Sequence, residues 1–304
     1  MEKTKPKLIV ILGQTASGKS SLAIKLAKKF DGEIVSADSR QIYRGMDIGT
    51  AKLLNHESIP HHLIDIVNPD EEFTLAEYKK IAVRKINEIL ERGKIPFLVG
   101  GTGLYVKAVV DNFGIPKVAS NKALRKKLEK KPTQELFEDL KRFDPKTAES
   151  IDSKNKRRLI RALEVKIFSG VSFVSAKKIA DPYFNTLQIG IKISREKLYK
   201  NIDQRVEEQI EMGLESEVKS IFEELSEKIE KEKIWSLPSM SGICYQEFKE
   251  YFEAKTGLEK VIQKIKLHNR QYARRQMTWF KRDKRIHWIE KPETAEKLIS
   301  EFLS

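Results

Sequence analysis

Short apolar runs and longer stretches with helical spacing alternate along most of this chain. Apolar runs of strand length occur at residues 8–12, 33–37, 62–67, 95–99, 187–193 and 286–289. Patterns of helical periodicity, such as those at 19–30 and 75–92, separate them. Strands that alternate with helices predict an α/β fold, with a mostly parallel sheet flanked by helices on both faces.

The middle of the chain lacks strand-like runs. Helical patterns follow one another at residues 122–131, 133–143, 145–151 and 155–169. Gly114 and Pro116 precede this stretch and Asp181-Pro182 ends it, and such residues commonly interrupt regular elements. We therefore predict a core domain at 1–115 and 186–304, which includes C-terminal helices, and a helical insertion domain at 116–185.

The first predicted strand runs directly into a glycine-rich loop and a helix. The loop matches G-x-x-x-x-G-K-[ST] and consists of Gly13, Gln14, Thr15, Ala16, Ser17, Gly18, Lys19 and Ser20. In such a P-loop the backbone N–H groups and the helix N-terminus surround phosphate oxygens, the lysine bridges phosphates and the serine can bind Mg²⁺. The sequence therefore predicts a P-loop NTPase-like core that binds a di- or triphosphate, ATP included.

Two further strand ends carry residues suited to chemistry. Asp38 follows the second strand, where a carboxylate can accept a proton or orient Mg²⁺, although capping a helix is the alternative role. The fourth strand ends in Gly100-Gly101-Thr102, which gives close backbone approach and a hydroxyl, or only a tight turn. An aspartate typical of many nucleotide hydrolases is missing from the latter position, which argues against an ATPase.

Positive charge is concentrated in two segments. The chain has a net charge of +14, while residues 115–185 hold 18 Lys and Arg against 9 Asp and Glu, and residues 266–285 hold 8 against 1. Concentrated blocks of this kind favour contact with a polyanion such as nucleic acid. The single cysteine, Cys244, favours a reducing cytoplasm, and no apolar run is long enough to span a membrane.

Several arginines fall at helical spacing. Arg205 shares a helix face with Gln209, where it could neutralise a leaving pyrophosphate or pair with a neighbouring glutamate. Arg270 and Arg274 alternate with aromatic residues, a pattern that suits RNA phosphates and bases but also an amphipathic helix. Arg157, Arg158 and Arg161 crowd one helical turn, which favours a bound phosphate or acidic neighbours such as Glu164.

Taken together, these motifs resemble the tRNA dimethylallyltransferase (tRNA isopentenyltransferase) family of the bacterial type. The resemblance covers nearly the whole chain and rests on residues 13–20, 38–52, 100–105, 157–165 and 270–280. One departure is Gln14, which stands where the family usually has proline. The resemblance implies transfer of a dimethylallyl group from dimethylallyl diphosphate to the N6 amine of adenosine 37, beside the anticodon, with release of pyrophosphate.

The resemblance also implies roles for single residues. The P-loop and Arg205 would bind the diphosphate, Ser20 would hold Mg²⁺, Asp38 would be the general base and Thr102 would lie beside the reacting centre. Contacts to the anticodon stem-loop of tRNA would come from Asp38, Ser39, Arg40, Gln41, Thr102, Arg125, Arg157, Arg158, Leu159, Ile160 and Arg161, with Arg270 and Arg274 added from the basic C-terminal segment.

We expect a monomer in the cytoplasm with no membrane contact. A small-molecule kinase and a nucleotide-switched RNA-binding module remain the rival functions. The kinase would explain Asp38 but not the two basic segments, and the switch would need a magnesium-sensing aspartate that we cannot place. Phosphate release from ATP would test both rivals.

Overall fold

The computed structural model describes residues 5–52, 59–177 and 180–304, and the chain divides into two compact units. The core unit comprises Met1–Val110 and Tyr183–Ser304, and the insertion comprises Asp111–Pro182. The sequence placed the insertion at 116–185. The C-terminal boundary falls earlier because Phe184 is buried in the hydrophobic core of the core unit, just before a strand that begins at Asn185.

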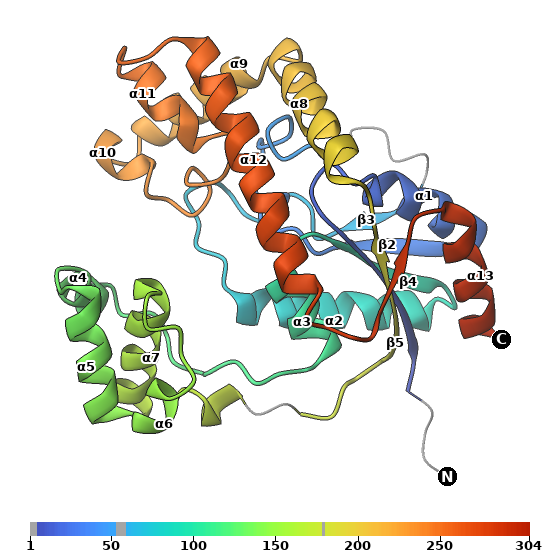
Figure 1. Cartoon of the computed structure of the whole chain (residues 1–304), viewed down its shortest axis with the longest axis horizontal. Helices are drawn as coiled ribbons and strands as arrows, with labels where there is room; N and C mark the ends of the chain where they lie inside the picture. The colour runs from blue at the N-terminus through green and yellow to red at the C-terminus, as the bar shows by residue number, and fades with distance from the viewer. Residues whose placement is uncertain (1–4, 53–58, 178–179) are drawn as a thin grey trace. The chain divides into compact units, whose positions relative to one another are not determined.

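Six parallel strands form the centre of the core unit (Figure 1). They are β1 (Lys7–Leu12), β2 (Gly32–Ser36), β3 (His61–His62), β4 (Ile95–Gly100), β5 (Asn185–Ile191) and β6 (Ile286–Ile289). Their order in the sheet is β3-β2-β4-β1-β5-β6, and all neighbouring pairs are parallel. The predicted α/β fold with a parallel sheet is confirmed.

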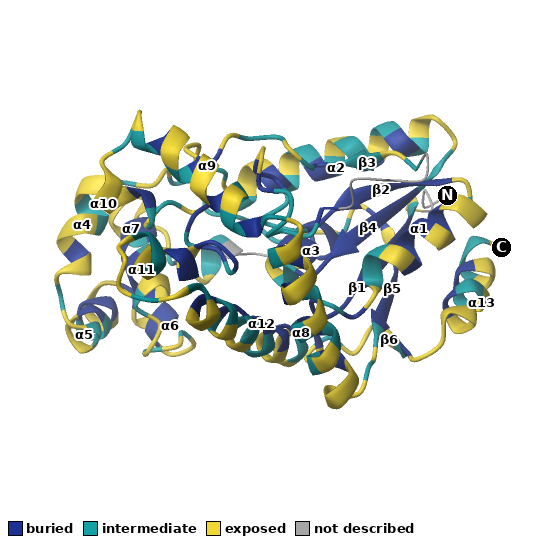
Figure 2. Cartoon of the chain, turned by 90° about the horizontal axis from the view of Figure 1, so that it is seen from above, coloured by how far each residue is buried: buried dark blue, intermediate teal, exposed yellow. Residues whose placement is uncertain are grey.

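Helices cover both faces of this sheet because successive strand residues point to opposite sides. Leu8, Val10 and Leu12 pack in the same cluster as residues of α2 (Leu75–Glu91) and α3 (Gly103–Val110). Ile9 and Ile11 pack with α1 (Lys19–Lys29) and α13 (Pro292–Leu303). The central strands β1, β2 and β4 are accordingly almost entirely buried, as their dark blue colour shows in Figure 2.

The remaining helices of the core unit build a third hydrophobic cluster. These helices are α8 (Arg195–Glu211), α9 (Leu214–Ser226), α10 (Lys231–Ile234), η2 (Gln246–Phe248), α11 (Lys249–Phe252) and α12 (Leu258–Phe280). Their apolar side chains enclose Ile42 and Met46, so the segment after β2 is anchored beneath them. In the described part of the chain, no helix combines the length and apolar character required to cross a membrane.

The insertion has its own hydrophobic core. It contains α4 (Lys122–Glu129), α5 (Thr133–Phe143), α6 (Pro145–Ala148), α7 (Lys156–Ser169) and η1 (Ser175–Lys177). Asn121, Asp144 and Asn155 cap three of these helices by accepting backbone N–H groups of the first turn. Leucines of α5 and α7 pack at the centre, so the predicted helical character of this segment is confirmed.

One predicted strand is mostly wrong. Residues 62–67 were expected to be extended, but β3 ends at His62. Leu63 and Asp65 have φ angles of 64° and 55°, in the left-handed region, which interrupts a continuous strand. The chain regains a single parallel bridge between Tyr43 and Val67.

Candidate active site

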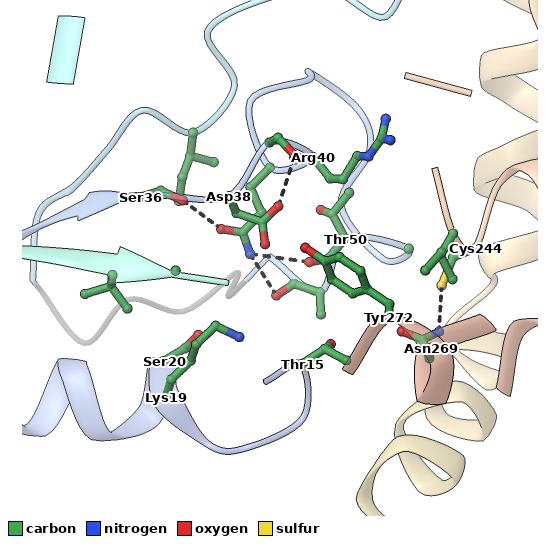
Figure 3. A pocket seen from close by; sticks show the side chains of 18 of the residues that line it. Thr15, Lys19, Ser20, Ser36, Asp38, Arg40, Thr50, Cys244, Asn269 and Tyr272 are labelled. Atoms are coloured by element: carbon green, nitrogen blue, oxygen red, sulfur yellow. Dashed lines mark hydrogen bonds between the residues drawn. The ribbon is translucent and has the colours of Figure 1, made fainter. Parts of the chain in front are cut away.

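A cavity of about 330 Å³ lies in the core unit where strand carboxyl ends meet. Leu12 at the end of β1 pairs with Gly100 at the end of β4, and Ser36 at the end of β2 pairs with Val99, so the segments that follow these strands lie side by side. The polar and charged residues that line the cavity include Thr15, Lys19, Ser20, Asp38, Arg40, Gln41, Thr50, Arg205, Asn269, Tyr272 and Arg275 (Figure 3).

The P-loop forms one wall of the cavity and is tied to α12. Gly18 has a φ of 84°, a conformation that side chains disfavour, and α1 begins directly after it. The backbone N–H of Thr15 donates to Gln276 Oε1 at 2.8 Å, and Gln14 Nε2 donates to the carbonyl oxygen of Ala273 at 2.9 Å. The glutamine that replaces the usual proline therefore joins the P-loop to a distant helix.

Two cations that line the cavity, Lys19 and Arg205, form no ion pair with an acidic side chain in the part of the chain that the structure describes. Burial lowers the pKa of Lys19 to about 8, while Asp38 raises it and Arg205 lowers it further. Burial also lowers the pKa of Arg205, whose Nη2 donates only to neutral oxygens, at 2.6 Å to Thr15 Oγ1 and at 3.3 Å to Asn269 Oδ1. Among the described residues, Arg205 Nε is buried with no hydrogen-bond partner.

Asp38 is the one acidic residue among the described residues that line this cavity. Its Oδ1 accepts the backbone N–H of Arg40 at 2.9 Å, which closes the turn after β2. The helix-capping alternative is wrong, because the described residues that follow Asp38, up to Lys52, form turns and no helix begins there; the functional role of this carboxylate stays a prediction. The cavity has more positive than negative charge, and an anion would satisfy the buried donors of Lys19 and Arg205.

Thr102 supports the Asp38 turn. Its Oγ1 accepts the backbone N–H of Ser39 at 3.0 Å and donates to Ser39 Oγ at 3.3 Å. The N–H of Thr102 donates to the carbonyl oxygen of Ala37 at 3.1 Å, a close approach that the preceding glycines permit. Because its hydroxyl faces Ser39, Thr102 fixes the position of Asp38, and its expected place beside the reacting centre stays a prediction.

Gln41 and Arg40 connect the same turn to other segments. Ser36 Oγ donates to Gln41 Oε1 at 3.1 Å, and Gln41 Nε2 donates to the carbonyl oxygen of Thr50 at 3.3 Å. The guanidinium of Arg40 donates to the carbonyl oxygen of Pro238. Residues 38–41 are thus held by their side chains in a defined arrangement around the cavity.

Two polar residues of α12, Asn269 and Gln276, were not expected from the sequence, and Tyr272 was expected only as one of the aromatic residues beside the arginines. The buried stripe of this helix includes Val261, Ile265, Ala273 and Phe280, but also the polar residues Asn269, Gln276 and, half-buried beside them, Tyr272. Polar residues on an otherwise apolar helical stripe were the signal that could have identified them. Burial, and then Asp38, raise the pKa of Tyr272 to about 12, so its hydroxyl stays protonated.

The basic segment at the end of α12 has two kinds of arginine. Arg270 forms an ion pair with Asp203. Arg274 is exposed and lines a shallow groove with Trp279 and Arg282. Arg275 lines both this groove and the main cavity, so a basic surface with an exposed tryptophan adjoins the site.

The insertion places its expected RNA-binding residues in three environments. Arg157 and Arg158 are exposed. Arg125 and Arg161 both bind Glu164, which is fully buried, so the acidic neighbour considered for this cluster is present. The side chains of Leu159 and Ile160 are buried in the hydrophobic core of the insertion, so the tRNA contact expected of these two residues, which stays a prediction, would come from their backbone.

The donor set of the cavity fits Mg²⁺. Ser20 and Asp38 supply hydroxyl and carboxylate oxygens, the hard ligands that this ion prefers. Within the described residues, no group of three or more His, Cys, Asp or Glu side chains forms a complete protein cage for a metal. Mg²⁺ commonly takes its other ligands from water and phosphate, so a site with few protein ligands is compatible with it.

Comparisons with known proteins agree with this geometry. The IPP transferase family model matches residues 41–283, and the isopentenyl transferase model matches residues 6–60. A tRNA dimethylallyltransferase from Pelotomaculum thermopropionicum is 43% identical over 296 residues, which is 95% of this chain and 92% of that protein. One from a Roseiflexus species is 45% identical over 281 residues, with 90% of each chain covered.

Solved structures give the same result. The tRNA isopentenylpyrophosphate transferase of Bacillus halodurans has a TM-score of 0.71 and 38% identity, and the match covers 98% of this chain and 96% of that one. A eukaryotic dimethylallyltransferase described as acting on tRNA has a TM-score of 0.78 and 31% identity, with 94% and 74% covered. This chain belongs to the tRNA dimethylallyltransferase family.

Proposed function

We propose that this chain transfers the dimethylallyl group of dimethylallyl diphosphate to the N6 amine of adenosine 37 in tRNA, with release of pyrophosphate. The observation that supports it best is the cavity in which Lys19 and Arg205 lack an anionic partner of their own and face one carboxylate, Asp38. Such a site suits a diphosphate leaving group beside a proton acceptor.

The donor would bind along the P-loop wall. The loop N–H groups, Lys19 and Arg205 would surround the diphosphate, and the otherwise unsatisfied Nε of Arg205 would gain an acceptor. Mg²⁺ held by Ser20 would supply further positive charge that stabilises the leaving pyrophosphate. These groups act most strongly as negative charge accumulates on the leaving oxygen, so they favour the transition state over the bound substrate.

The reaction would proceed at the Asp38 side of the cavity. The N6 nitrogen forms a bond to C1 of the allyl group while the C1–O bond breaks. The electron pair of the C1–O bond leaves with pyrophosphate. Asp38 takes the proton that N6 loses. The backbone N–H of Arg40 holds the carboxylate in place, and Tyr272, whose hydroxyl stays protonated, lines the same cavity.

The acceptor would be tRNA, approached through the anticodon stem-loop. An exocyclic amine reaches an enclosed cavity only if its base leaves the stack, and the displaced loop then needs contacts of its own. Arg274, Trp279 and Arg282 line a groove that shares Arg275 with the cavity, and they offer phosphate contacts and a stacking surface. Exposed arginines of the insertion supply further positive charge.

Transfer of radiolabel from dimethylallyl diphosphate to unmodified tRNA in the presence of Mg²⁺ tests this proposal. We expect label in the wild-type reaction and a loss of about 10²- to 10⁴-fold in rate for Asp38→Ala, the range for a general base. Binding of dimethylallyl diphosphate should persist in this variant. A synthetic anticodon stem-loop with guanosine at position 37 is the matched control and should stay unlabelled.

The same assay with ATP in place of the prenyl donor separates the rival functions. Consumption of ATP without label transfer from dimethylallyl diphosphate to tRNA would overturn the proposal in favour of a kinase.

A further inference from the structure

One wall of the cavity is a short loop whose role the proposed chemistry does not explain. We call residues 47–51 the wall loop; its Gly49, Thr50 and Ala51 line the cavity. Gln41, which follows Asp38 on the same segment, donates through Nε2 to the carbonyl oxygens of Thr50 and Ala51 at 3.3 and 3.4 Å. The position of the wall loop therefore determines the position of Gln41, on the side of the cavity that carries the general base.

A single carboxylate from another helix holds the wall loop. Glu217 in α9 accepts the backbone N–H groups of Asp47 and Ile48 on Oε2, at 2.9 and 2.6 Å, and that of Gly49 on Oε1 at 3.0 Å. The hydroxyl of Tyr245 donates to the same Oε1 at 2.6 Å. Four donors use the full accepting capacity of an ionised carboxylate, which a neutral amide cannot match.

Packing and further hydrogen bonds reinforce this arrangement. A Cβ atom on Gly49 would lie 2.6 Å from the Tyr245 ring, so the loop is pressed against the same tyrosine that binds Glu217. Gln209 Nε2 donates to the carbonyl oxygen of Ile48 at 2.5 Å. At the far end, Lys52 Nζ donates to Asp47 Oδ1 at 2.7 Å. Among the described residues, Glu217 is the one group that accepts three successive N–H groups of the loop.

We propose that Glu217 is a positioning residue for the acceptor, which fixes the wall loop and, through it, Gln41 and the Asp38 turn. This inference rests on the proposed function, because the acceptor is the tRNA adenosine. Among the described residues, the hydrogen bonds of Glu217 go to the wall loop and Tyr245, whereas the P-loop is held by Gln276 and Ala273 in α12 and by Asn201 in α8. Loss of the carboxylate should therefore impair use of tRNA and leave binding of the prenyl donor intact.

The key variant is Glu217→Gln, which keeps the shape of the side chain. Its NH₂ group would face backbone N–H donors, so at least one hydrogen bond is replaced by a repulsive contact. We expect kcat/KM for tRNA to fall about 10- to 100-fold, the range for losing hydrogen bonds to a charged group. The KM for dimethylallyl diphosphate and the stoichiometry of pyrophosphate binding should match the wild type. Tyr245→Phe removes one of the four donors and should give a smaller loss of the same kind.

The chain supplies a matched control on the same helix. Glu215 accepts the hydroxyl of Tyr251 at 2.9 Å, the same chemical pair, but the three backbone N–H groups of the wall loop donate to Glu217 and not to Glu215. Glu215→Gln should therefore retain wild-type kcat/KM for tRNA. Equal losses for both variants, or a reduced pyrophosphate stoichiometry in Glu217→Gln, would show that Glu217 serves stability alone and would overturn the proposal.

Hydrogen exchange gives a second measurement that does not depend on catalysis. Exchange of the amides in a peptide covering residues 46–52 should be about tenfold faster in Glu217→Gln than in the wild type or Glu215→Gln, because their acceptor is weakened. A wild-type protein without transferase activity would refute the proposed function, while this exchange would still test the link between Glu217 and the wall loop. Unchanged exchange in Glu217→Gln would refute that link.

Discussion

Arg205 in the cavity and Arg125 in the insertion are both half-buried, yet their partners differ. Arg125 donates through Nε and Nη2 to the two carboxylate oxygens of Glu164, at 2.9 and 2.7 Å. Arg205 donates only to the neutral oxygens of Thr15 and Asn269, and its Nε has no partner among the described residues. Arg125 is neutralised by a carboxylate of the chain, whereas Arg205 gains a counter-ion only when an external anion binds.

The difference separates a structural charge from a functional one. Withdrawing a guanidinium from water costs free energy, and Glu164 offsets that cost for Arg125 within the folded protein. For Arg205 the cost is recovered only when a ligand with negative charge binds. A cation that is retained without an internal counter-ion therefore marks the site at which the ligand binds.

The same substitution at Arg205 and at Arg125 should separate the two roles, and Arg205→Met should cause the largest loss of activity among the variants compared below. Arg205→Met should lower kcat/KM for dimethylallyl diphosphate by about 10²- to 10³-fold, as expected for a donor that stabilises a developing anion. Its melting temperature without ligand should equal or exceed that of the wild type, because a buried charge is removed. Added pyrophosphate should raise the melting temperature of the wild type far more than that of this variant.

Arg125→Met is the matched control for Arg205→Met. It leaves Glu164 with one fewer partner, so the insertion should lose stability while stabilisation by pyrophosphate stays at the wild-type level. The comparison would break if Arg205→Met lowered the melting temperature as much as Arg125→Met, since Arg205 would then act as a structural residue.

The fold was largely predictable because its signals are local. The apolar runs of β1 and β4, the P-loop and the helical insertion each depend on neighbouring residues. The prediction failed at residues 63–67, where an apolar run takes left-handed backbone angles at Leu63 and Asp65. Those angles depend on tertiary contacts, such as the ion pair of Asp65 with Lys52, which a periodic pattern does not reveal.

The site was only partly predictable for a related reason. The P-loop with Lys19 and the segment with Asp38 each follow a parallel strand, so the sequence placed them together, whereas two roles stayed open for Arg205. Gln276 and Glu217 act on segments that lie more than a hundred residues away, on the P-loop and the wall loop. Pairings at such separations depend on how helices pack, and a single sequence carries no signal for them.

A smaller effect is expected when the internal counter-ion of the insertion is removed. Glu164→Gln weakens the hydrogen bonds from Arg125, Arg161 and the backbone N–H of Asn121, and should lower the free energy of unfolding of the insertion by about 1–3 kcal/mol. Thermal melts of the whole chain, together with hydrogen exchange of the α7 amides, would measure this loss of stability. Pyrophosphate binding should not change.

The pH dependence gives an additional test of Glu164. Burial opposes its ionisation, but hydrogen bonds from Arg125, Asn121 and Arg161 outweigh it and lower its pKa. A lowered pKa in the folded state means that the stabilisation is complete above the pKa of the unfolded chain, normally about 4.3, and is lost as the pH falls through the folded value. Glu164→Gln should lack this acid-sensitive part, and an unchanged acid profile would contradict the assignment.

The smallest expected effect concerns Lys19, whose pKa burial lowers from 10.5 to about 8. Only the protonated amine attracts a diphosphate, so kcat/KM for dimethylallyl diphosphate should fall by up to about tenfold per pH unit above that value. Asp38 raises this pKa, so Asp38→Asn should move the fall to lower pH. Lys19→Arg should remove the fall, because a guanidinium stays charged throughout.

The lowered pKa of Lys19 should make kcat/KM fall as the pH rises, but it should make the folded protein more stable over the same pH range. Because the unfolded chain keeps the Lys19 proton up to about 10.5 and the folded chain loses it near 8, the free protein should become more stable as the pH rises between these values. Bound pyrophosphate should suppress this gain, since an anion favours the charged amine. A pH profile of kcat/KM that is flat above pH 8 in the wild type and in Asp38→Asn would show that Lys19, like Arg125, already has its counter-ion within the chain.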